Sequence, residues 1–143
     1  MAIQGIDVSR YQGNINWSNV KAAGIQFAML KAGSGSGTVD SQFHTNAAAC
    51  QSLGIPFCVY WYSYALTAAD ARKEAEAWIN EVKKYKLSYP VCYDLEEQSF
   101  SNAQSQGVTI NKALASAMVR AFCGRVEELG YYAMFYSNRN NLN

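Results

Sequence analysis

The sequence has few of the features that mark metal-binding, nucleic-acid-binding or membrane proteins. Its 143 residues include 1 His and 4 Cys, and no two cysteines form a C-x-x-C pair, so we expect no metal site and reduced cysteines in the interior. The formal net charge of +1 argues against a nucleic-acid partner. No apolar run reaches the length of a membrane span, which excludes membrane insertion. The chain also opens directly into structure, without the consecutive regions of a signal peptide.

The composition is that of a globular domain. Half of the residues are hydrophobic and 16% are charged, which is enough apolar material for one core, and we expect residues 1–143 to form a single domain. The chain is rich in aromatic residues, with 10 Tyr and 3 Trp. Tyrosines and tryptophans in such number suit platforms on which sugars stack, and they suit ordinary packing equally well.

Residues 89–97 form the stretch around which the other motifs are organised. A short apolar run ends in the three carboxylates Asp94, Glu96 and Glu97, as in a buried strand whose carboxyl end opens onto a site. Alternation along a strand would put Asp94 and Glu96 on one face, with Cα atoms roughly 6.6 Å apart, and Glu97 on the other face. Two carboxyl groups so close would raise one pKa. The alternative is a solvated acidic turn.

Short strand patterns alternate with helical patterns along the whole chain, which predicts right-handed βαβ units and a parallel sheet. The predicted strands are residues 5–8, 25–31, 55–62, 91–96 and 131–136, and the predicted helices are residues 17–23, 43–53, 68–84 and 110–129. Two segments, residues 32–38 and 97–108, are predicted to be loops. A further helix is expected to begin after Ser137 and Asn138.

Polar and aromatic residues gather where these strands end, and in parallel sheets sites form at the carboxyl ends of the strands. We therefore expect one site, to which several strands contribute. Its candidate residues are Asp7, Lys31, Tyr60, Tyr62, Asp94, Glu96 and Tyr136.

Several motifs of the sequence resemble those of family 25 glycoside hydrolases, the Chalaropsis-type lysozymes, which are N-acetylmuramidases. Residues 5–13 (Gly-Ile-Asp-Val-Ser-Arg-Tyr-Gln-Gly), followed by Trp17, resemble the amino terminus of that family. Residues 27–32 are similar to its second strand, and residues 93–96 to its pair of acids. The resemblance implies an α/β fold, an incomplete TIM-like (β/α) barrel of about five βα units. It also implies a carboxyl-terminal truncation, with the last strands of the barrel missing.

The same resemblance implies hydrolysis of the β-1,4 bond between N-acetylmuramic acid and N-acetylglucosamine in peptidoglycan, without a cofactor or a metal. Glu96 would be the general acid, with a raised pKa, and Asp94 would stabilise the developing positive charge, either as a nucleophile or by orienting the 2-acetamido group of the substrate. Asp7 would tune this pair. The residues implied in substrate binding are Tyr60, Tyr62, Lys31 and Tyr136.

A different class of function also fits the sequence, because an incomplete barrel exposes sheet edges. The chain would then be an inactive cell-wall-binding module or a self-associating barrel fragment. In either case the expected partners are the glycan strands of peptidoglycan, and the expected place of action is the cell wall, outside the cell. The lack of a signal peptide is consistent with release as a phage endolysin.

Overall fold

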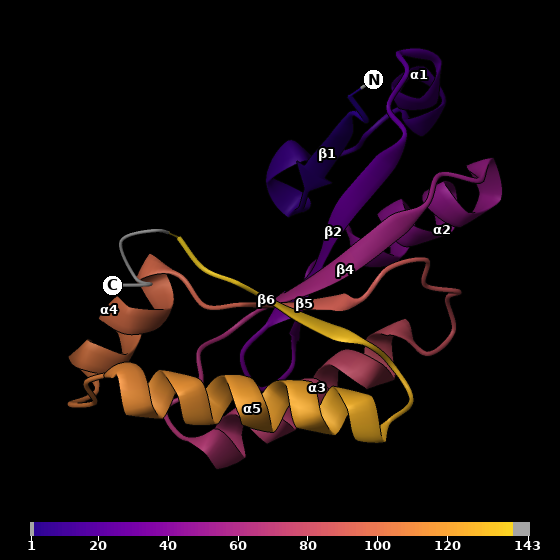
Figure 1. The fold of residues 1–143 in the computed structure, drawn as a ribbon. Coiled ribbons are helices and arrows are strands. Elements are labelled where there is room, and N and C mark those ends of the chain that lie inside the picture. Colours follow the sequence, from indigo (N-terminus) through magenta and orange to yellow (C-terminus); the bar gives the residue numbers. More distant parts are fainter. Residues whose placement is uncertain (1, 139–143) are drawn as a thin grey trace.

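The computed structural model describes residues 2–138, which form one parallel sheet with helices between its strands (Figure 1). The sheet order is β1-β2-β4-β5-β6, and every neighbouring pair along this path is parallel. These strands are β1 (Gly5–Val8), β2 (Phe27–Ser34), β4 (Phe57–Tyr62), β5 (Val91–Asp94) and β6 (Ala133–Tyr136). The predicted alternation of strands and helices is confirmed, and within residues 2–138 the sheet stays open between β1 and β6.

The helices connect successive strands, as right-handed βαβ units require. They are the short η1 (Arg10–Gln12) and α1 (Trp17–Ala22), then α2 (Phe43–Leu53), α3 (Ala68–Val82), α4 (Glu97–Ser105) and α5 (Lys112–Glu128). None of the helices within residues 2–138 is both long and apolar enough to cross a bilayer. The further helix predicted after Asn138 lies outside the described residues.

The core lies between one face of the sheet and the helices α2, α3 and α5. Leu30, Trp61 and Tyr93 are fully buried on that face. The ring of Tyr93 stacks on Phe122 of α5, with centroids 4.2 Å apart, which fixes α5 against β5. Helix α3 contributes buried residues at the four-, three- and four-residue spacing of an apolar stripe, namely Ala71, Ala75, Trp78 and Val82.

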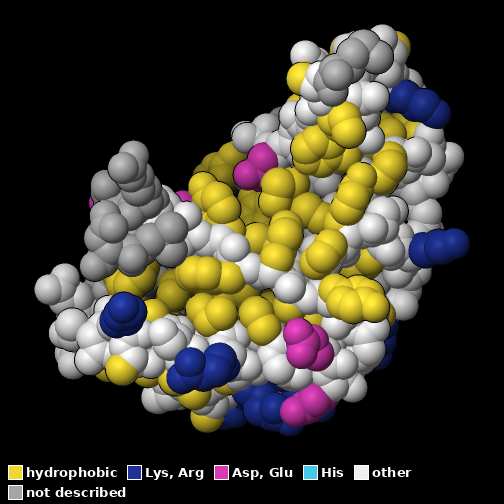
Figure 2. All heavy atoms as spheres, in the orientation of Figure 1, with side chains coloured by type: hydrophobic (Ala, Val, Ile, Leu, Met, Phe, Trp, Pro, Cys, Tyr) yellow, Lys and Arg dark blue, Asp and Glu magenta, His cyan; other side chains and the backbone are white. Residues whose placement is uncertain are grey.

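The opposite face of the sheet carries the candidate site. Strand alternation and the register of the parallel pairs put Asp7, Met29, Cys58, Cys92 and Met134 on this inner face. Figure 2 shows hydrophobic side chains gathered in the hollow across the middle of the molecule. Met134 on β6 is 38% exposed, so the inner face is partly open to solvent.

The segment 32–38 is not the loop that the sequence predicted. Strand β2 continues to Ser34, turns back through Gly35 and Gly37, and pairs antiparallel with β3 (Thr38–Val39). Gly33 makes this hairpin possible, because a Cβ there would overlap the backbone oxygen of Thr38 and lie 2.7 Å from the Trp61 ring. Gly33 therefore serves close packing, and Gly35 and Gly37 serve the turn, where their φ angles are positive.

The segment 97–108 is likewise not a loop, because residues Glu97–Ser105 form α4. Strand β5 ends at Asp94, and Glu96 is the amino-terminal capping residue of α4 instead of a strand residue. The backbone amide of Glu96 donates to Oγ of Ser99 at 3.2 Å, in the reciprocal pattern of a capping box. The polar composition of this segment concealed a helix that buries few residues.

Candidate active site

Two carboxyl groups meet where β5 passes into α4. Asp94 is the last residue of β5 and is 5% exposed, whereas Glu96 is half-buried. The two side chains share a hydrogen bond, in which the protonated carboxyl of Asp94 donates to Glu96. The contact comes from the turn into α4 and not from a common strand face, so the predicted proximity is confirmed although its predicted origin is wrong.

Burial raises the pKa of Asp94 far above its usual range. The hydrogen bond to Glu96 and the negative charges of Glu96 and Asp7 raise this pKa further, and the nearby Lys31 opposes them. Oδ1 of Asp94 is buried without a hydrogen-bond partner among the described residues, which also disfavours the ionised form. A raised pKa is thus found at Asp94, the more buried member of the pair, and the raised pKa expected of Glu96 stays a prediction.

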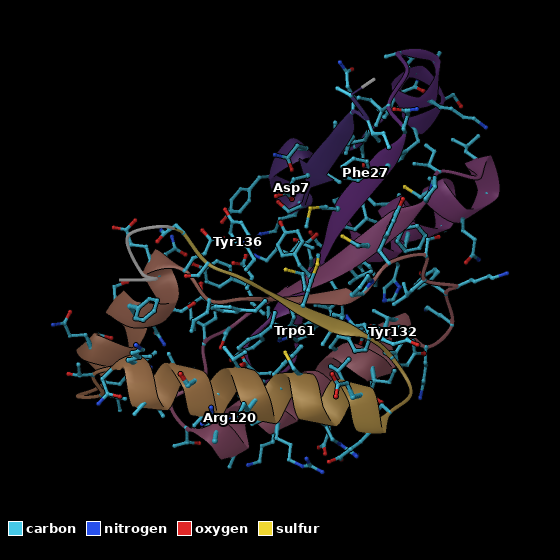
Figure 3. The ribbon with its side chains drawn as sticks, viewed as in Figure 1. Asp7, Phe27, Trp61, Arg120, Tyr132 and Tyr136 are labelled. Carbon is cyan, nitrogen blue, oxygen red and sulfur yellow. The ribbon has the colours of Figure 1, made fainter. Side chains whose placement is uncertain are left out.

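Asp7 joins this pair from the other edge of the described sheet. It lies on β1, paired in register with Met29 of β2, and Figure 3 shows it on the strand farthest in sheet order from Tyr136 on β6. Partial burial of its carboxyl raises the pKa of Asp7, a hydrogen bond from Tyr60 lowers it, and the charge of Glu96 raises it. These mutual effects indicate that Asp7, far from the other two in sequence, lies near Asp94 and Glu96.

Lys31 and Tyr60 lie between these acids. They are register partners on β2 and β4, so both side chains project from the same face of the sheet. Burial is the first cause that raises the pKa of Tyr60, and the charge of Asp7, to which its hydroxyl donates, is the second. The ammonium group of Lys31 favours the ionised forms of both Asp7 and Asp94. The cluster therefore holds one cation among three carboxyl groups.

Two further tyrosines extend the site along the carboxyl ends of the strands. Tyr62 and Tyr136 flank Asp94 in register, one on each neighbouring strand. The hydroxyl of Tyr62 accepts a hydrogen bond from the backbone amide of Gln98 at 3.2 Å, and Nζ of Lys31 lies 5.5 Å from the centroid of the Tyr62 ring. Tyr136 is 50% exposed, as a side chain available to a ligand would be.

All seven residues predicted for the site thus lie at one end of the sheet. Six of them are linked by hydrogen bonds, charge effects or ring contacts, and Tyr136 is placed beside them by its pairing with Asp94. Glu97, predicted to lie away from the site, is exposed on the first turn of α4. Within residues 2–138 no group of three or more His, Cys, Asp or Glu side chains could hold a metal ion.

A buried polar cluster beneath this site was missed by the sequence analysis. Glu74 of α3 is 1% exposed and accepts hydrogen bonds from Oγ of Ser63 at 2.7 Å, from the hydroxyl of Tyr93 at 3.2 Å and from the amide of Tyr64 at 2.9 Å. Burial raises the pKa of Glu74 to about 7. The burial of Glu74 could have been predicted from the sequence, because this acid falls on the apolar stripe of α3 beside Ala71 and Ala75.

Comparison with known proteins gives one consistent family. The family described as "Glycosyl hydrolases family 25" matches residues 6–143, nearly the whole chain. Lysozyme M1 of Streptomyces globisporus is 49% identical over 53 residues, which are 37% of this chain and 18% of that protein.

Solved structures agree in fold. The modular autolysin LytC of Streptococcus pneumoniae superposes with a TM-score of 0.86 at 29% identity, covering 96% of this chain and 33% of LytC. LytC has also been solved in complex with a synthetic peptidoglycan ligand. A family 25 glycosyl hydrolase from Bacillus anthracis superposes with a TM-score of 0.83 at 24% identity, covering 98% of this chain and 62% of that one. The chain therefore spans less than two thirds of each of these relatives.

Proposed function

The chain belongs to glycosyl hydrolase family 25, and from this premise we propose that it is a muramidase. It hydrolyses the β-1,4 bond between N-acetylmuramic acid and N-acetylglucosamine in peptidoglycan. The observation that carries the proposal is the meeting of Asp7, Asp94 and Glu96 at the end of the sheet. Relatives that are named lysozyme and autolysin, one of them solved with a peptidoglycan ligand, support the substrate.

The acid pair suits the two needs of glycoside hydrolysis, a proton for the leaving oxygen and a negative charge beside the oxocarbenium-like carbon. The shared proton of Asp94 and Glu96 supplies both. Asp94 passes this proton to Glu96, the more accessible of the two, and Glu96 delivers it to the leaving oxygen. Asp94 is thereby left ionised next to the carbon that becomes positive. Asp7 and Lys31 set the balance of charge around the pair.

The distance between the two carboxyl groups bears on whether the reaction inverts or retains the configuration of the sugar's anomeric carbon. An inverting enzyme keeps its acid and base roughly 6.5–9.5 Å apart, to leave room for the attacking water. Carboxyl groups in direct hydrogen bond, as Asp94 and Glu96 are, are too close for that arrangement. Retaining enzymes keep the two carboxyl groups closer, roughly 5–5.5 Å apart. The contact here is shorter still and so favours retention of configuration, with Asp94 acting either as the nucleophile or by orienting the 2-acetamido group. In both versions a water molecule then completes the reaction, and Glu96 accepts its proton.

Tyr60, Tyr62, Tyr136 and Lys31 would bind the sugars. Their side chains project from neighbouring strands at the same end of the sheet, where rings and a cation can contact a glycan laid across the strand ends. We expect the protein to act on the cell wall, outside the membrane, as a released endolysin does.

One observation favours a second candidate, a wall-binding or self-associating protein without activity. The sheet is open between β1 and β6 within residues 2–138, and Phe135 on β6 is 40% exposed. An open strand with exposed apolar side chains can pair with another copy of the chain. Light scattering tests the self-associating form of this candidate, because a monomer at high concentration would count against self-association.

Clearing of bacterial cell-wall suspensions distinguishes the two candidates. The muramidase proposal predicts that the wild-type protein clears the suspension and that Glu96→Gln does not. Glu97→Gln is the matched control, since Glu97 is adjacent in sequence but exposed on α4, and this variant should clear walls like the wild type. If all three proteins pellet with the walls and none clears them, the enzyme proposal fails and the binding candidate stands.

A further inference from the structure

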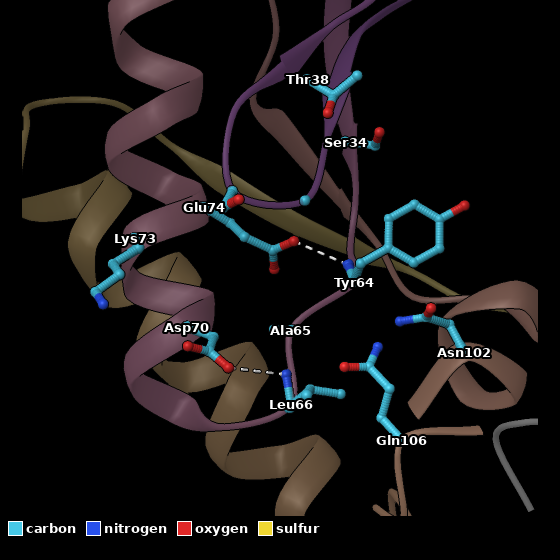
Figure 4. Close-up of a pocket in the computed structure, with 12 residues that line it drawn as sticks. Ser34, Thr38, Tyr64, Ala65, Leu66, Asp70, Lys73, Glu74, Asn102 and Gln106 are labelled. Atoms are coloured by element: carbon cyan, nitrogen blue, oxygen red, sulfur yellow. Dashed lines mark hydrogen bonds between the residues drawn. The ribbon is translucent and has the colours of Figure 1, made fainter. Parts of the chain in front are cut away.

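A second hollow lies beside the acid cluster and shares none of its seven residues. It has a volume of about 610 Å³ and opens between the β2–β3 hairpin, the segment after β4, and the helices α3 and α4 (Figure 4). We call it the rim pocket, and the residues that matter here are Ser36, Tyr64, Asp70, Lys73, Asn102 and Gln106. Its volume falls within the range of about 300–1,000 Å³ that is usual for small-ligand sites.

The lining of the rim pocket is polar and of mixed charge. Hydroxyl groups come from the hairpin, side-chain amides from Asn102 of α4 and Gln106 at its end, an ammonium group from Lys73, and carboxyl groups from Asp70 and the buried Glu74. Asp70 is already engaged, because it accepts a hydrogen bond from the amide of Leu66 at 3.2 Å. Within residues 2–138 the side chains of Lys73, Asn102 and Gln106 have no hydrogen-bond partner. These donors and acceptors are free to bind a ligand.

Tyr64 connects the rim pocket to the acid cluster. Its backbone amide is held by the buried Glu74 at 2.9 Å, and its hydroxyl donates to Gln98 at 3.2 Å. Its ring lies 5.3 Å from the Tyr62 ring, which in turn lies 5.5 Å from Nζ of Lys31, beside Asp94. The wall of the pocket is therefore also an edge of the site, and one ligand can extend from the acids over Tyr62 and Tyr64 into the pocket.

We propose that the rim pocket binds the stem peptide of peptidoglycan, the short peptide attached to the lactyl group of N-acetylmuramic acid. This inference rests on the proposed function, since it takes the glycan strand to lie at the acids. A peptide presents N–H and C=O groups at close spacing and carries carboxylates, which match the amides of Asn102 and Gln106 and the ammonium group of Lys73. A further sugar ring is a poorer match, because Tyr64 is the only aromatic side chain among the described residues that line the pocket.

The test compares glycan strands that carry stem peptides with the same strands after an amidase has removed the peptides. The wild-type protein should have the higher kcat/KM on peptide-bearing strands. In the double variant Asn102→Ala, Gln106→Ala, kcat/KM on peptide-bearing strands should fall about tenfold, as expected when one or two hydrogen bonds are lost. Its kcat/KM on the stripped strands should equal that of the wild type. Gln104→Ala is the matched control, because Gln104 lies on the same helix, is exposed and does not line the pocket.

If the double variant lost kcat/KM equally on both substrates, or kept the wild-type preference for peptide-bearing strands, the inference would be overturned. The muramidase proposal would remain intact. A binding measurement covers the case in which the protein cleaves neither substrate and the muramidase proposal fails. N-acetylmuramoyl tripeptide, which has no scissile glycosidic bond, is titrated into the isotope-labelled wild-type protein. The inference predicts that the amide NMR signals of Tyr64, Asn102 and Gln106 shift while that of Gln104 does not, and the absence of such shifts would refute it.

Discussion

The sharpest prediction on stability concerns Glu74, buried beneath the site. Its pKa is raised from 4.5 to about 7 by burial, which the hydrogen bonds from Tyr64, Ser63 and Tyr93 only partly offset. This difference corresponds to about 3 kcal/mol between the protonated and the ionised side chain in the folded state. Because the folded pKa is the higher one, the stabilisation is fully present below pH 4.5 and is lost as the pH rises through about 7.

The variant Glu74→Gln tests this reasoning, since an amide keeps the shape and stays neutral at every pH. In urea unfolding from pH 4.5 to pH 8.5, the free energy of unfolding of the variant should rise relative to that of the wild type as the pH rises, by up to about 3 kcal/mol. Glu76→Gln is the matched control, because Glu76 lies on the same helix but is 48% exposed in an ion pair with Arg125, and it should show no such trend. The account would be refuted if the difference in free energy of unfolding between Glu74→Gln and the wild type stayed constant with pH. It would also be refuted if the variant became less stable relative to the wild type at high pH.

Two further predictions concern the site and the hairpin beside it. Tyr60→Phe removes the hydroxyl that lowers the pKa of Asp7, so the acid limb of the pH–activity profile should move to higher pH and kcat/KM should fall about tenfold; an unchanged profile would contradict the contact. Gly33→Ala should lower the free energy of unfolding by about 1–3 kcal/mol, because its Cβ would overlap the Thr38 backbone. Gly124→Ala, within α5 and with open space around it, should instead be stabilising by about 0.5–1 kcal/mol, and calorimetry compares the two.

The parts of the fold that the sequence predicted well are those with strong periodicity. The stripe of Ala71, Ala75 and Trp78 predicted α3 within two residues at its end, because only a helix brings these side chains onto one face. The five parallel strands followed from their short apolar runs. The convergence of the site residues followed in turn, since the carboxyl ends of parallel strands meet at one end of the sheet.

The errors occurred where polar residues mediate the structure. Helix α4 was predicted as a loop because it buries little beyond Ser99 and Ala103 and so shows almost no apolar period. Helix α5 begins at Lys112, two residues later than predicted, because Asn111 caps it with a side chain that accepts from the amide of Leu114 at 2.8 Å. Thr109 is also a good capping residue, and only the path of the chain into the helix decides between the two.

The location of the raised pKa could not be predicted from sequence for a similar reason. The spacing of Asp94 and Glu96 predicts that two carboxyl groups interact, but which of them holds the proton depends on relative burial. Asp94 ends a strand that is buried on both faces, whereas Glu96 caps a helix and is only half-buried. The sequence alone contains no measure of this difference, since both residues follow the same apolar run.

The most direct test of the muramidase proposal is to identify the new reducing ends released from purified peptidoglycan, by borohydride reduction and mass spectrometry. The account predicts fragments that end in reduced N-acetylmuramic acid, in amounts that fall to background with Glu96→Gln and stay at the wild-type level with Glu97→Gln. Fragments ending in reduced N-acetylglucosamine, or equal release by Glu96→Gln and the wild type, would contradict it.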